Sequence, residues 1–207
     1  MTAGLPQLAV DWGPVSAWVA AGATLGAVLV ALFGPWLWRR LRHPSLEITF
    51  EPGEPCCRGT VWSNGKRDYW IRVRVRNVGQ DVARACVGKV TRVNTGTEFR
   101  SDIDPMQLRW CGVPDRHGFD PIHLAENQDE FLNVFCIVEG DPIIGFETYP
   151  SEDFSPGHPT HLDSGAEHQV QISVVADNAD PIAVWLTVKY TGDFVDLPSS
   201  LTMSVTA

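Results

Sequence analysis

The stretch Tyr69-Trp-Ile-Arg-Val-Arg-Val-Arg-Asn77 decides the fold class of the larger part of this chain. Its isoleucine and two valines alternate with three arginines, and a period of two predicts a β-strand with one apolar face and one basic face. The following Asn77-Val-Gly-Gln80 is typical of a turn. Residues 83–93 resume the alternation, and Gly88 indicates a β-bulge within that second strand.

Similar short alternating stretches lie on both sides of this pair, and Gly, Pro, Asn and Asp separate them. No amphipathic stretch of helical length follows residue 44, and residues 52–67 are typical of a loop. Many short strands joined by turns favour an antiparallel β-sandwich over residues 45–207, which we expect to be immunoglobulin-like. The further predicted strands cover residues 46–50, 107–111, 130–138, 142–149, 168–176, 182–190 and 201–205.

Two segments carry a resemblance to a known family. The segment Val73-Arg-Val-Arg-Asn77-Val-Gly79-Gln-Asp-Val-Ala83 resembles bacterial immunoglobulin-like domains of the CARDB type, in which a strand ends in Asn-x-Gly and a small residue begins the next strand. Residues 162–174 are similar to the Gly-turn-strand of those domains. The resemblance implies a sandwich and no activity, because such sandwiches host unrelated functions. CARDB-type domains are usually extracellular, and an N-terminal anchor joined to one resembles uncharacterised bacterial single-pass membrane proteins.

A long uncharged segment precedes the strands. No formal charge occurs in the 27 residues between Asp11 and Arg39. A helix over residues 14–38 would be about 37 Å long, enough to cross the hydrocarbon core of a bilayer. We therefore expect a tail over residues 1–13, a transmembrane helix over 14–38 that contacts the lipid bilayer, and a basic linker over 39–44. Tryptophans at both ends fit interfacial aromatic belts, namely Trp12, Trp18, Trp36 and Trp38.

The charges that flank this segment predict its orientation. Arg39, Arg40 and Arg42 follow it, and no Lys or Arg precedes it. The positive-inside rule then places the N-terminus outside and the sandwich in the cytosol, as a single-pass protein of the cell membrane. A cleavable signal peptide is disfavoured because the basic n-region is missing and the apolar run is too long. A sandwich on the outside is the alternative, and it would favour adhesion or envelope binding.

Two glycines and one proline are expected to affect how the helix packs and where it bends or ends. Gly22 and Gly26 form a small-xxx-small pair that allows two helices to approach closely, so we consider a homodimer through this face. The alternative is that small residues are simply common in membrane spans. Gly34-Pro35 is expected to bend or end the helix, because proline lacks a backbone donor.

Charge and cysteine content narrow the function classes. Residues 1–43 contain three arginines and one acid, a net charge of +2, whereas the remainder contains 13 basic and 24 acidic residues, a net charge of −11. A domain this acidic is not expected to bind nucleic acid, where neutralising phosphate dominates affinity. An odd number of cysteines favours reduced thiols, although a bridge between Cys86 and Cys136 stays open. The five cysteines are Cys56, Cys57, Cys86, Cys111 and Cys136.

Several clusters of reactive residue types occur in the sequence, and none of them predicts a catalytic, cofactor or metal site. Imidazole and carboxylate groups bind borderline cations, and thiol with imidazole can form a nucleophile, but ordinary loop or structural residues are the expected explanation of each cluster. The stretch 88–91 lacks the glycine of a phosphate-binding loop, and the aspartates lack an EF-hand pattern. The clusters are His158, His161, Asp163 and His168; Cys111, Asp115 and His117; and Asp102, Asp104 and Asp115.

The row Arg72, Arg74 and Arg76 is the strongest candidate for ligand contact. The guanidinium groups are expected on one sheet face, about 7 Å apart, where they could bind phosphate or an acidic partner. Pairing with acids on neighbouring strands is the alternative. Four tryptophans are expected to pack or to form a binding surface, namely Trp62, Trp70, Trp110 and Trp185.

These features predict a membrane-anchored, non-enzymatic binding, sensing or scaffold module with a protein partner or small ligand. Loops 52–67 and 94–128 are the expected contact surface, because loops on a rigid scaffold commonly carry function. One alternative is a membrane effector whose spans oligomerise when the sandwich senses a signal. A tethered metal-dependent hydrolase that uses the His158 region is a third class.

Overall fold

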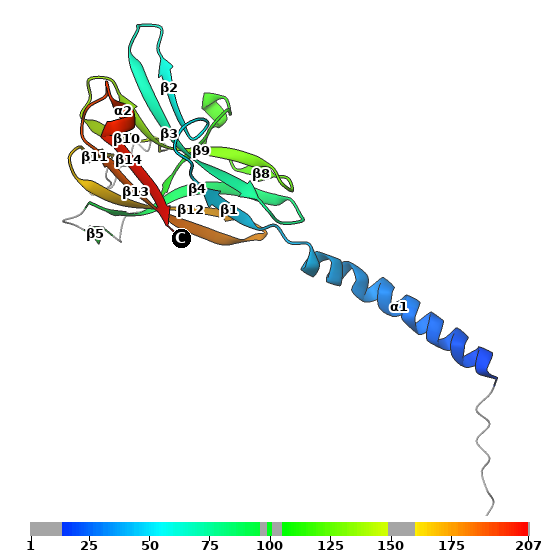
Figure 1. The fold of residues 1–207 in the computed structure, drawn as a ribbon. Coiled ribbons are helices and arrows are strands. Elements are labelled where there is room, and N and C mark those ends of the chain that lie inside the picture. Colours follow the sequence, from blue (N-terminus) through cyan, green and yellow to red (C-terminus); the bar gives the residue numbers. More distant parts are fainter. Residues whose placement is uncertain (1–13, 96–98, 101–104, 149–159, 207) are drawn as a thin grey trace, which may run out of the picture. The chain divides into compact units, whose positions relative to one another are not determined.

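The computed structural model describes residues 14–95, 99–100, 105–148 and 160–206. The chain divides into two compact units, one that ends at Arg42 and one that extends from His43 to Ala207. Figure 1 shows a long helix in the first unit and two layers of strands in the second.

The first unit contains helix α1, Val15–Leu41. Its segment Val15–Leu37 is long and apolar enough to cross a membrane, and none of it is buried inside the protein. Thr24, a polar residue in this segment, donates a hydrogen bond from its hydroxyl to the carbonyl of Ala20 at 2.9 Å. The helix does not end at Gly34-Pro35, because it continues through Pro35 to Leu41. A proline removes only one donor, and the many remaining hydrogen bonds of a long helix compensate for it.

The second unit is a β-sandwich of two antiparallel sheets (Figure 1). In sheet I the strand order is β1-β3-β9-β10-β11, with β2 also paired to β3 and β7 to β9. Its strands are β1 (Leu46–Thr49), β2 (Cys57–Val61), β3 (Arg67–Asn77), β7 (Arg109–Trp110), β9 (Asp129–Val138), β10 (Ile143–Phe146) and β11 (His161–Asp163).

In sheet II the order is β14-β13-β12-β4-β5, with β6 and β8 also paired to β4. Its strands are β4 (Ala83–Asn94), β5 (Phe99–Arg100), β6 (Met106–Gln107), β8 (Ile122–Leu124), β12 (Glu167–Ala176), β13 (Ala179–Tyr190) and β14 (Leu201–Thr206). Two short helices complete the described elements, η1 (Asp115–His117) and α2 (Leu197–Ser200). The predicted all-β sandwich behind one N-terminal helix is therefore confirmed.

The core lies between the inner faces of the two sheets. On β3 the apolar residues Ile71, Val73 and Val75 are fully buried, as their alternation with arginine predicts. Gly88 on β4 faces Leu132 on β9 so closely that a Cβ at Gly88 would lie 2.2 Å from the leucine Cδ2. Gly88 therefore allows close contact between the sheets, and the expected bulge lies instead at Thr91, where the β4–β12 register shifts.

Four described strands were not predicted from sequence, namely β2, β5, β8 and β11. β2 lies inside the expected loop 52–67, and its residues Cys-Arg-Gly-Thr-Val carry no apolar alternation. It forms because it pairs with the first half of β3, from Cys57 opposite Ile71 to Val61 opposite Arg67. β5 has two residues and β8 and β11 have three each, too few to show a period. β8 depends on a strand distant in sequence, because it pairs with β4, whereas β2 pairs with β3 in a hairpin.

A buried asparagine organises the turn between β3 and β4. The Asn77 carboxamide oxygen accepts hydrogen bonds from the backbone N–H of Ser45 at 3.2 Å and of Gly79 at 3.0 Å. Its amide nitrogen donates to the carbonyls of Asp81 at 2.7 Å and Leu124 at 2.9 Å. Asn77 is fully buried. The Asn-x-Gly pattern therefore joins the start of the domain, the turn and the β8 segment through one side chain.

Gly79 has a steric role in the same turn. A Cβ at this position would lie 2.3 Å from the Ser45 nitrogen and 2.4 Å from the His43 carbonyl oxygen. The segment that enters the sandwich is hydrogen-bonded here, because Val78 N–H donates to the Ser45 carbonyl and Gln80 N–H to that of His43. Only glycine allows the two backbones to approach so closely. We call Asn77, Gly79 and residues 43–45 the β3–β4 corner.

Candidate functional site

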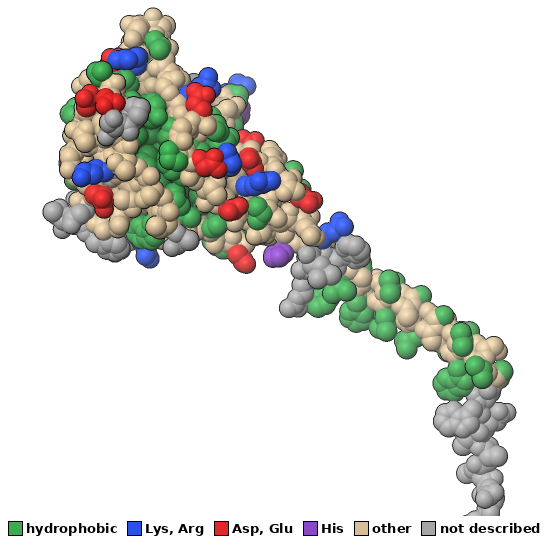
Figure 2. Space-filling model, viewed as in Figure 1, with side chains coloured by type: hydrophobic (Ala, Val, Ile, Leu, Met, Phe, Trp, Pro, Cys, Tyr) green, Lys and Arg blue, Asp and Glu red, His purple; other side chains and the backbone are tan. Residues whose placement is uncertain are grey.

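An open groove lies beside strand β14. It has a volume of about 420 Å³. Figure 2, viewed as in Figure 1, shows hydrophobic side chains gathered along the face of the sandwich that carries β14. The groove takes residues from the chain after β1, from β2 and β3, and from α2 and β14: Phe50, Pro52, Gly53, Cys57, Tyr69, Leu197, Leu201, Thr202 and Met203. It is therefore a largely apolar hollow where the edges of the two sheets meet.

Only part of this groove coincides with the predicted contact surface. Pro52, Gly53 and Cys57 belong to the loop 52–67 that was expected to contact a partner. Leu197 and the residues of β14 were expected only as an ordinary C-terminal strand and its approach. No local signal identifies them, because the groove depends on which strand lies at the edge of each sheet. Pairing order is a property of the tertiary structure.

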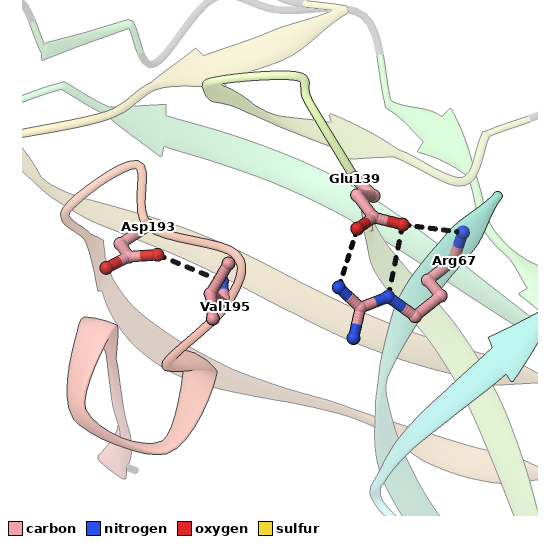
Figure 3. A network of polar contacts seen from close by, with 4 residues as sticks. All are labelled: Arg67, Glu139, Asp193 and Val195. Atoms are coloured by element: carbon pink, nitrogen blue, oxygen red, sulfur yellow. Dashed lines mark hydrogen bonds and ion pairs between the residues drawn. The ribbon is translucent and has the colours of Figure 1, made fainter.

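Hydrogen bonds within the loop before β14 position Leu197. Thr191 N–H donates to the carbonyl of Ser200 at 2.9 Å, which closes the loop at its base. The Ser200 hydroxyl donates to the Asp193 carbonyl at 2.6 Å, and Val195 N–H donates to the Asp193 carboxylate at 2.9 Å (Figure 3). Leu197 is buried within this loop, with 8% of its surface exposed. The loop therefore provides a defined wall to the groove.

An ion pair from sheet I contacts the same loop. Arg67 binds Glu139 through two parallel hydrogen bonds, Nη2 to Oε1 at 2.6 Å and Nε to Oε2 at 3.1 Å (Figure 3). These bonds lower the pKa of the Glu139 carboxyl. The Arg67 guanidinium also lies over the Phe194 ring, 5.4 Å from its centroid. A planar guanidinium can make both contacts at once, so Arg67 links the turn after β9 to the loop before β14.

The polar groups in the groove are neutral at physiological pH. Burial raises the pKa of the Cys57 thiol above its ordinary value. Burial, with a smaller contribution from the neighbouring Cys57, raises the pKa of Tyr69 to about 12. A protonated thiol is a poor nucleophile, because the thiolate is the reactive form. The groove is therefore suited to an apolar ligand.

The predicted arginine row lies on the outer face of sheet I and contacts neighbouring polar side chains. Arg72 Nε donates to the Asn133 carboxamide oxygen at 2.9 Å. Arg76 Nε lies 3.4 Å from the Asp129 carboxylate, and Arg74 Nε lies 3.9 Å from the same carboxylate. All three arginines are half-buried or partly exposed. The structure brings them together as predicted, each beside a partner from β9.

The four predicted tryptophans occupy different environments. Trp110 is a core residue with 1% of its surface exposed, whereas Trp62 is 53% exposed. Trp62 lies at the tip of the β2–β3 hairpin, which extends beyond the two sheets (Figure 1). Its indole N–H donates to the buried carboxylate of Asp68 at 2.5 Å. Trp70 and Trp185 are half-buried, so Trp62 is the exposed member of the four.

The described residues of the histidine cluster have separate partners. His168 is buried, and its Nε2 lies 2.8 Å from the backbone carbonyl oxygen of Asp163. His161 Nε2 lies 3.8 Å from the Asp163 carboxylate. His158, Asp102 and Asp104 lie outside the described residues. Within the described ranges, no group of three His, Cys, Asp or Glu side chains could hold a metal ion.

Cys111 and His117 of the thiol cluster also have other partners. Cys111 follows β7, and its backbone N–H donates to the carbonyl of Phe131 at 2.7 Å. His117 Nδ1 lies 2.7 Å from the Asp120 carboxylate. Asp115 lies in η1.

All five cysteines are unbridged, including Cys86 and Cys136. Burial raises the pKa of Cys86 to about 11 and that of Cys136 to about 12. Both thiols are therefore protonated at neutral pH.

Gly22 and Gly26 lie one helical turn apart on α1. Both positions are open, because a Cβ at either glycine would meet no atom within 4 Å. The small-residue face of the helix is thus accessible to a second helix.

Comparison of the chain with protein-family models, curated proteins and solved structures finds no match. The resemblance to CARDB-type domains therefore stays a prediction, and the functional argument rests on the geometry of the groove, the sheet edges and helix α1.

Proposed function

We propose that this protein is a membrane-anchored, non-enzymatic binding module that recognises an apolar side chain or small apolar ligand in the groove beside β14. The observation that carries the proposal is the groove itself, about 420 Å³ of open volume. Concave, mainly apolar sites of this size are typical of ligand binding. The neutral Cys57 and Tyr69 support an uncharged ligand, because they offer no fixed charge to a charged one.

The strand order supports an immunoglobulin-like assignment of the sandwich. β1, β3 and β9 are neighbours in sheet I, and β4, β12 and β13 are neighbours in sheet II. Immunoglobulin domains pair their first, second and fifth strands in one sheet and their third, sixth and seventh strands in the other. Such scaffolds bind through surfaces at their edges and loops, which agrees with the position of the groove.

Membrane attachment through α1 and a cytosolic sandwich complete the proposal. The length and apolar composition of Val15–Leu37 support a membrane span. The three arginines after the span support the cytosolic side, and the unbridged thiols agree with a reducing compartment. Tethering would confine the binding module to the membrane surface and raise its effective concentration there.

Two matched phenylalanines provide the test. A photo-crosslinking phenylalanine analogue at Phe50, which lines the groove, is compared with the same analogue at Phe131 on β9. In membranes of expressing cells, Phe50 should form a discrete adduct that Leu201→Asp abolishes, whereas Phe131 should not. Identical adducts from both positions, or adducts insensitive to Leu201→Asp, would contradict a binding role for the groove. Reporters fused after Ala207 test the orientation, and activity of the external reporter alone would favour an adhesion or envelope-binding role.

A second candidate function is a membrane effector in which the spans oligomerise. The open positions at Gly22 and Gly26 favour it, because close helix contact requires that no side chain intervene. The double variant Gly22→Ile/Gly26→Ile should abolish self-association of the chain together with any effect that its expression has on the cell. Leu25→Ile, which keeps side-chain volume on another face, is the matched control. Unchanged behaviour of the glycine variant would exclude this candidate.

A further inference from the structure

We infer that strand β14 is a pairing edge for a second copy of this chain, so that sheet II continues across a symmetric dimer. β14 is the last strand of its sheet and has a strand neighbour on one side only within the described residues. An exposed strand edge offers unpaired backbone donors and acceptors to another strand. This inference concerns the backbone of β14 and does not depend on a ligand in the groove.

The other edge strands of the described residues are protected and β14 is not. β1 has four residues and includes Glu47, and β2 includes Arg58. The part of β13 that extends past β14 carries Asp180 and Pro181. β5, β6, β7, β8 and β11 are only two or three residues long. In contrast, β14 has six residues, Leu-Thr-Met-Ser-Val-Thr, with no charge and no proline. Charged residues, proline and short length are the usual protection of an edge, so β14 lacks all three.

The pairing with β13 determines which backbone groups of β14 point outward. Thr191 N–H donates to the Ser200 carbonyl, so Thr191 and Ser200 form a hydrogen-bonded pair. The next pair along the ladder is Tyr190 opposite Leu201, which is therefore a non-hydrogen-bonded pair. Bonded and non-bonded pairs alternate in an antiparallel ladder, so the N–H and C=O groups of Met203 and Val205 point away from β13. The Leu201 N–H already donates to the carbonyl of Leu197, which leaves its carbonyl as the outward acceptor.

A two-fold axis through Met203 would pair these outward backbone groups with those of a second copy. Met203 then forms a bonded pair with Met203 of the second copy, and each Val205 N–H donates to the Leu201 carbonyl of the other chain. The same register places the half-buried apolar residues together on the inner face. On the outer face it places Thr202 opposite Ser204 of the second copy, both exposed and uncharged. The strand is therefore self-complementary in hydrogen bonding and in polarity.

Membrane attachment would favour this pairing. Two chains anchored in one bilayer have a high effective concentration, so a small strand interface can suffice where it would fail in solution. The open face at Gly22 and Gly26 allows the helices of the same two chains to meet. A segment of another protein could use the same edge, and the experiment distinguishes that outcome.

The test compares two double variants of the full chain in lipid vesicles, both in a Gly22→Ile/Gly26→Ile background that removes helix association. Thr202→Lys with Ser204→Lys places lysine opposite lysine in the proposed register. Thr202→Glu with Ser204→Lys places glutamate opposite lysine. Association is measured by energy transfer between labelled chains and compared with the parent chain, which carries only the two glycine substitutions. The lysine–lysine variant should have an association constant about tenfold lower than the parent chain, and the glutamate–lysine variant should have one that is not reduced. Equal association of both variants, or no association of the parent chain, would overturn the inference.

A cysteine pair tests the register independently of the charge variants. Met203→Cys should form a disulfide-linked dimer on mild oxidation, because Cα atoms of a bonded pair lie about 5.5 Å apart. Ser204→Cys is the matched control, because its Cα would lie more than about 7 Å from its counterpart. The unsubstituted chain gives the background from its own thiols. Equal cross-linking of the two variants, or a cross-link of Met203→Cys only to another protein, would overturn the self-pairing.

Discussion

The β3–β4 corner and the groove beside β14 differ in how completely their polar groups are hydrogen-bonded and their side chains are buried. At the corner, the buried Asn77 carboxamide has four backbone partners, and no Cβ fits at Gly79. At the groove, Leu201 and Met203 are only half-buried, and the β14 backbone pairs on one side. A fully satisfied, close-packed region contributes stability, whereas an incompletely covered one is available for binding. The difference predicts that substitutions at the corner unfold the domain and that substitutions at the groove change its interactions.

The largest effect is expected for Gly79→Ala. The new Cβ would lie 2.3 Å from the Ser45 nitrogen, and a backbone atom cannot move aside as a side chain can. We expect the free energy of unfolding to fall by about 3 kcal/mol or more. Gly59→Ala is the control, because its nearest contact would be 3.8 Å, an ordinary distance. Equal denaturation midpoints for the two variants in urea would show that the corner is not close-packed.

The next largest loss of unfolding free energy is expected for Asn77→Ala. It leaves the Asp81 and Leu124 carbonyls and the Ser45 and Gly79 amides without their partner. Unsatisfied buried groups should cost about 2–4 kcal/mol of unfolding free energy. Asn64→Ala removes an exposed asparagine that makes one local hydrogen bond, so it should cost under about 1 kcal/mol. Calorimetry of both variants measures the contrast, and similar values would contradict the role of Asn77.

Alkaline pH should destabilise the sandwich. The pKa values of the Cys86 and Cys136 thiols are raised from 9.0 to about 11 and about 12 in the folded protein. Below pH 9 both states keep the protons, and stability does not depend on these groups. Above pH 9 the unfolded thiols ionise first, so the unfolding free energy falls as pH rises towards 11. Urea unfolding from pH 8 to 11 measures this, and Cys136→Ala should reduce the slope. An unchanged slope in that variant would contradict the buried, protonated thiol.

A groove substitution should affect stability less. Leu201→Thr changes a half-buried side chain, so we expect a loss of about 1 kcal/mol or less, together with loss of the Phe50 adduct. Leu186→Thr on the adjacent β13 changes a fully buried leucine and should cost several times more. Thermal unfolding of the two variants compares an edge with the core. A larger loss for Leu201→Thr would show that the groove is part of the core.

The smallest effect is expected for Arg76→Gln. Arg76 and Asp129 form a surface ion pair at 3.4 Å, with 43% and 36% of the side chains exposed. Exposed pairs contribute little, so unfolding free energy should change by less than about 0.5 kcal/mol, and less in high salt. A loss above about 1 kcal/mol in chemical denaturation would show that the arginine row stabilises the sheet directly.

Local patterns predicted much of the fold. The alternation in residues 69–77, 168–176 and 182–190 corresponds to β3, β12 and β13, because a half-buried strand needs a period of two. The uncharged run corresponds to α1, although the helix passes through Pro35 instead of ending there.

The candidate site was predicted only in part. The arginine row and the open glycines of α1 lie where the sequence places them, since both are local properties of one strand or one helix. The groove and the unprotected edge of β14 were not predicted. Each requires knowing which strands of the two sheets end up beside each other.

The sequence by itself therefore determined the period of each long strand, the apolar helix and the Asn-x-Gly turn, because these depend on neighbouring residues. The tertiary structure alone decided that β8 pairs with β4, that Gly88 lies against Leu132 and that β14 is an outer strand. Those features arise from contacts between residues distant in the chain. Since pairing partners and sheet order are chosen by the packing of the whole domain, no single segment encodes them.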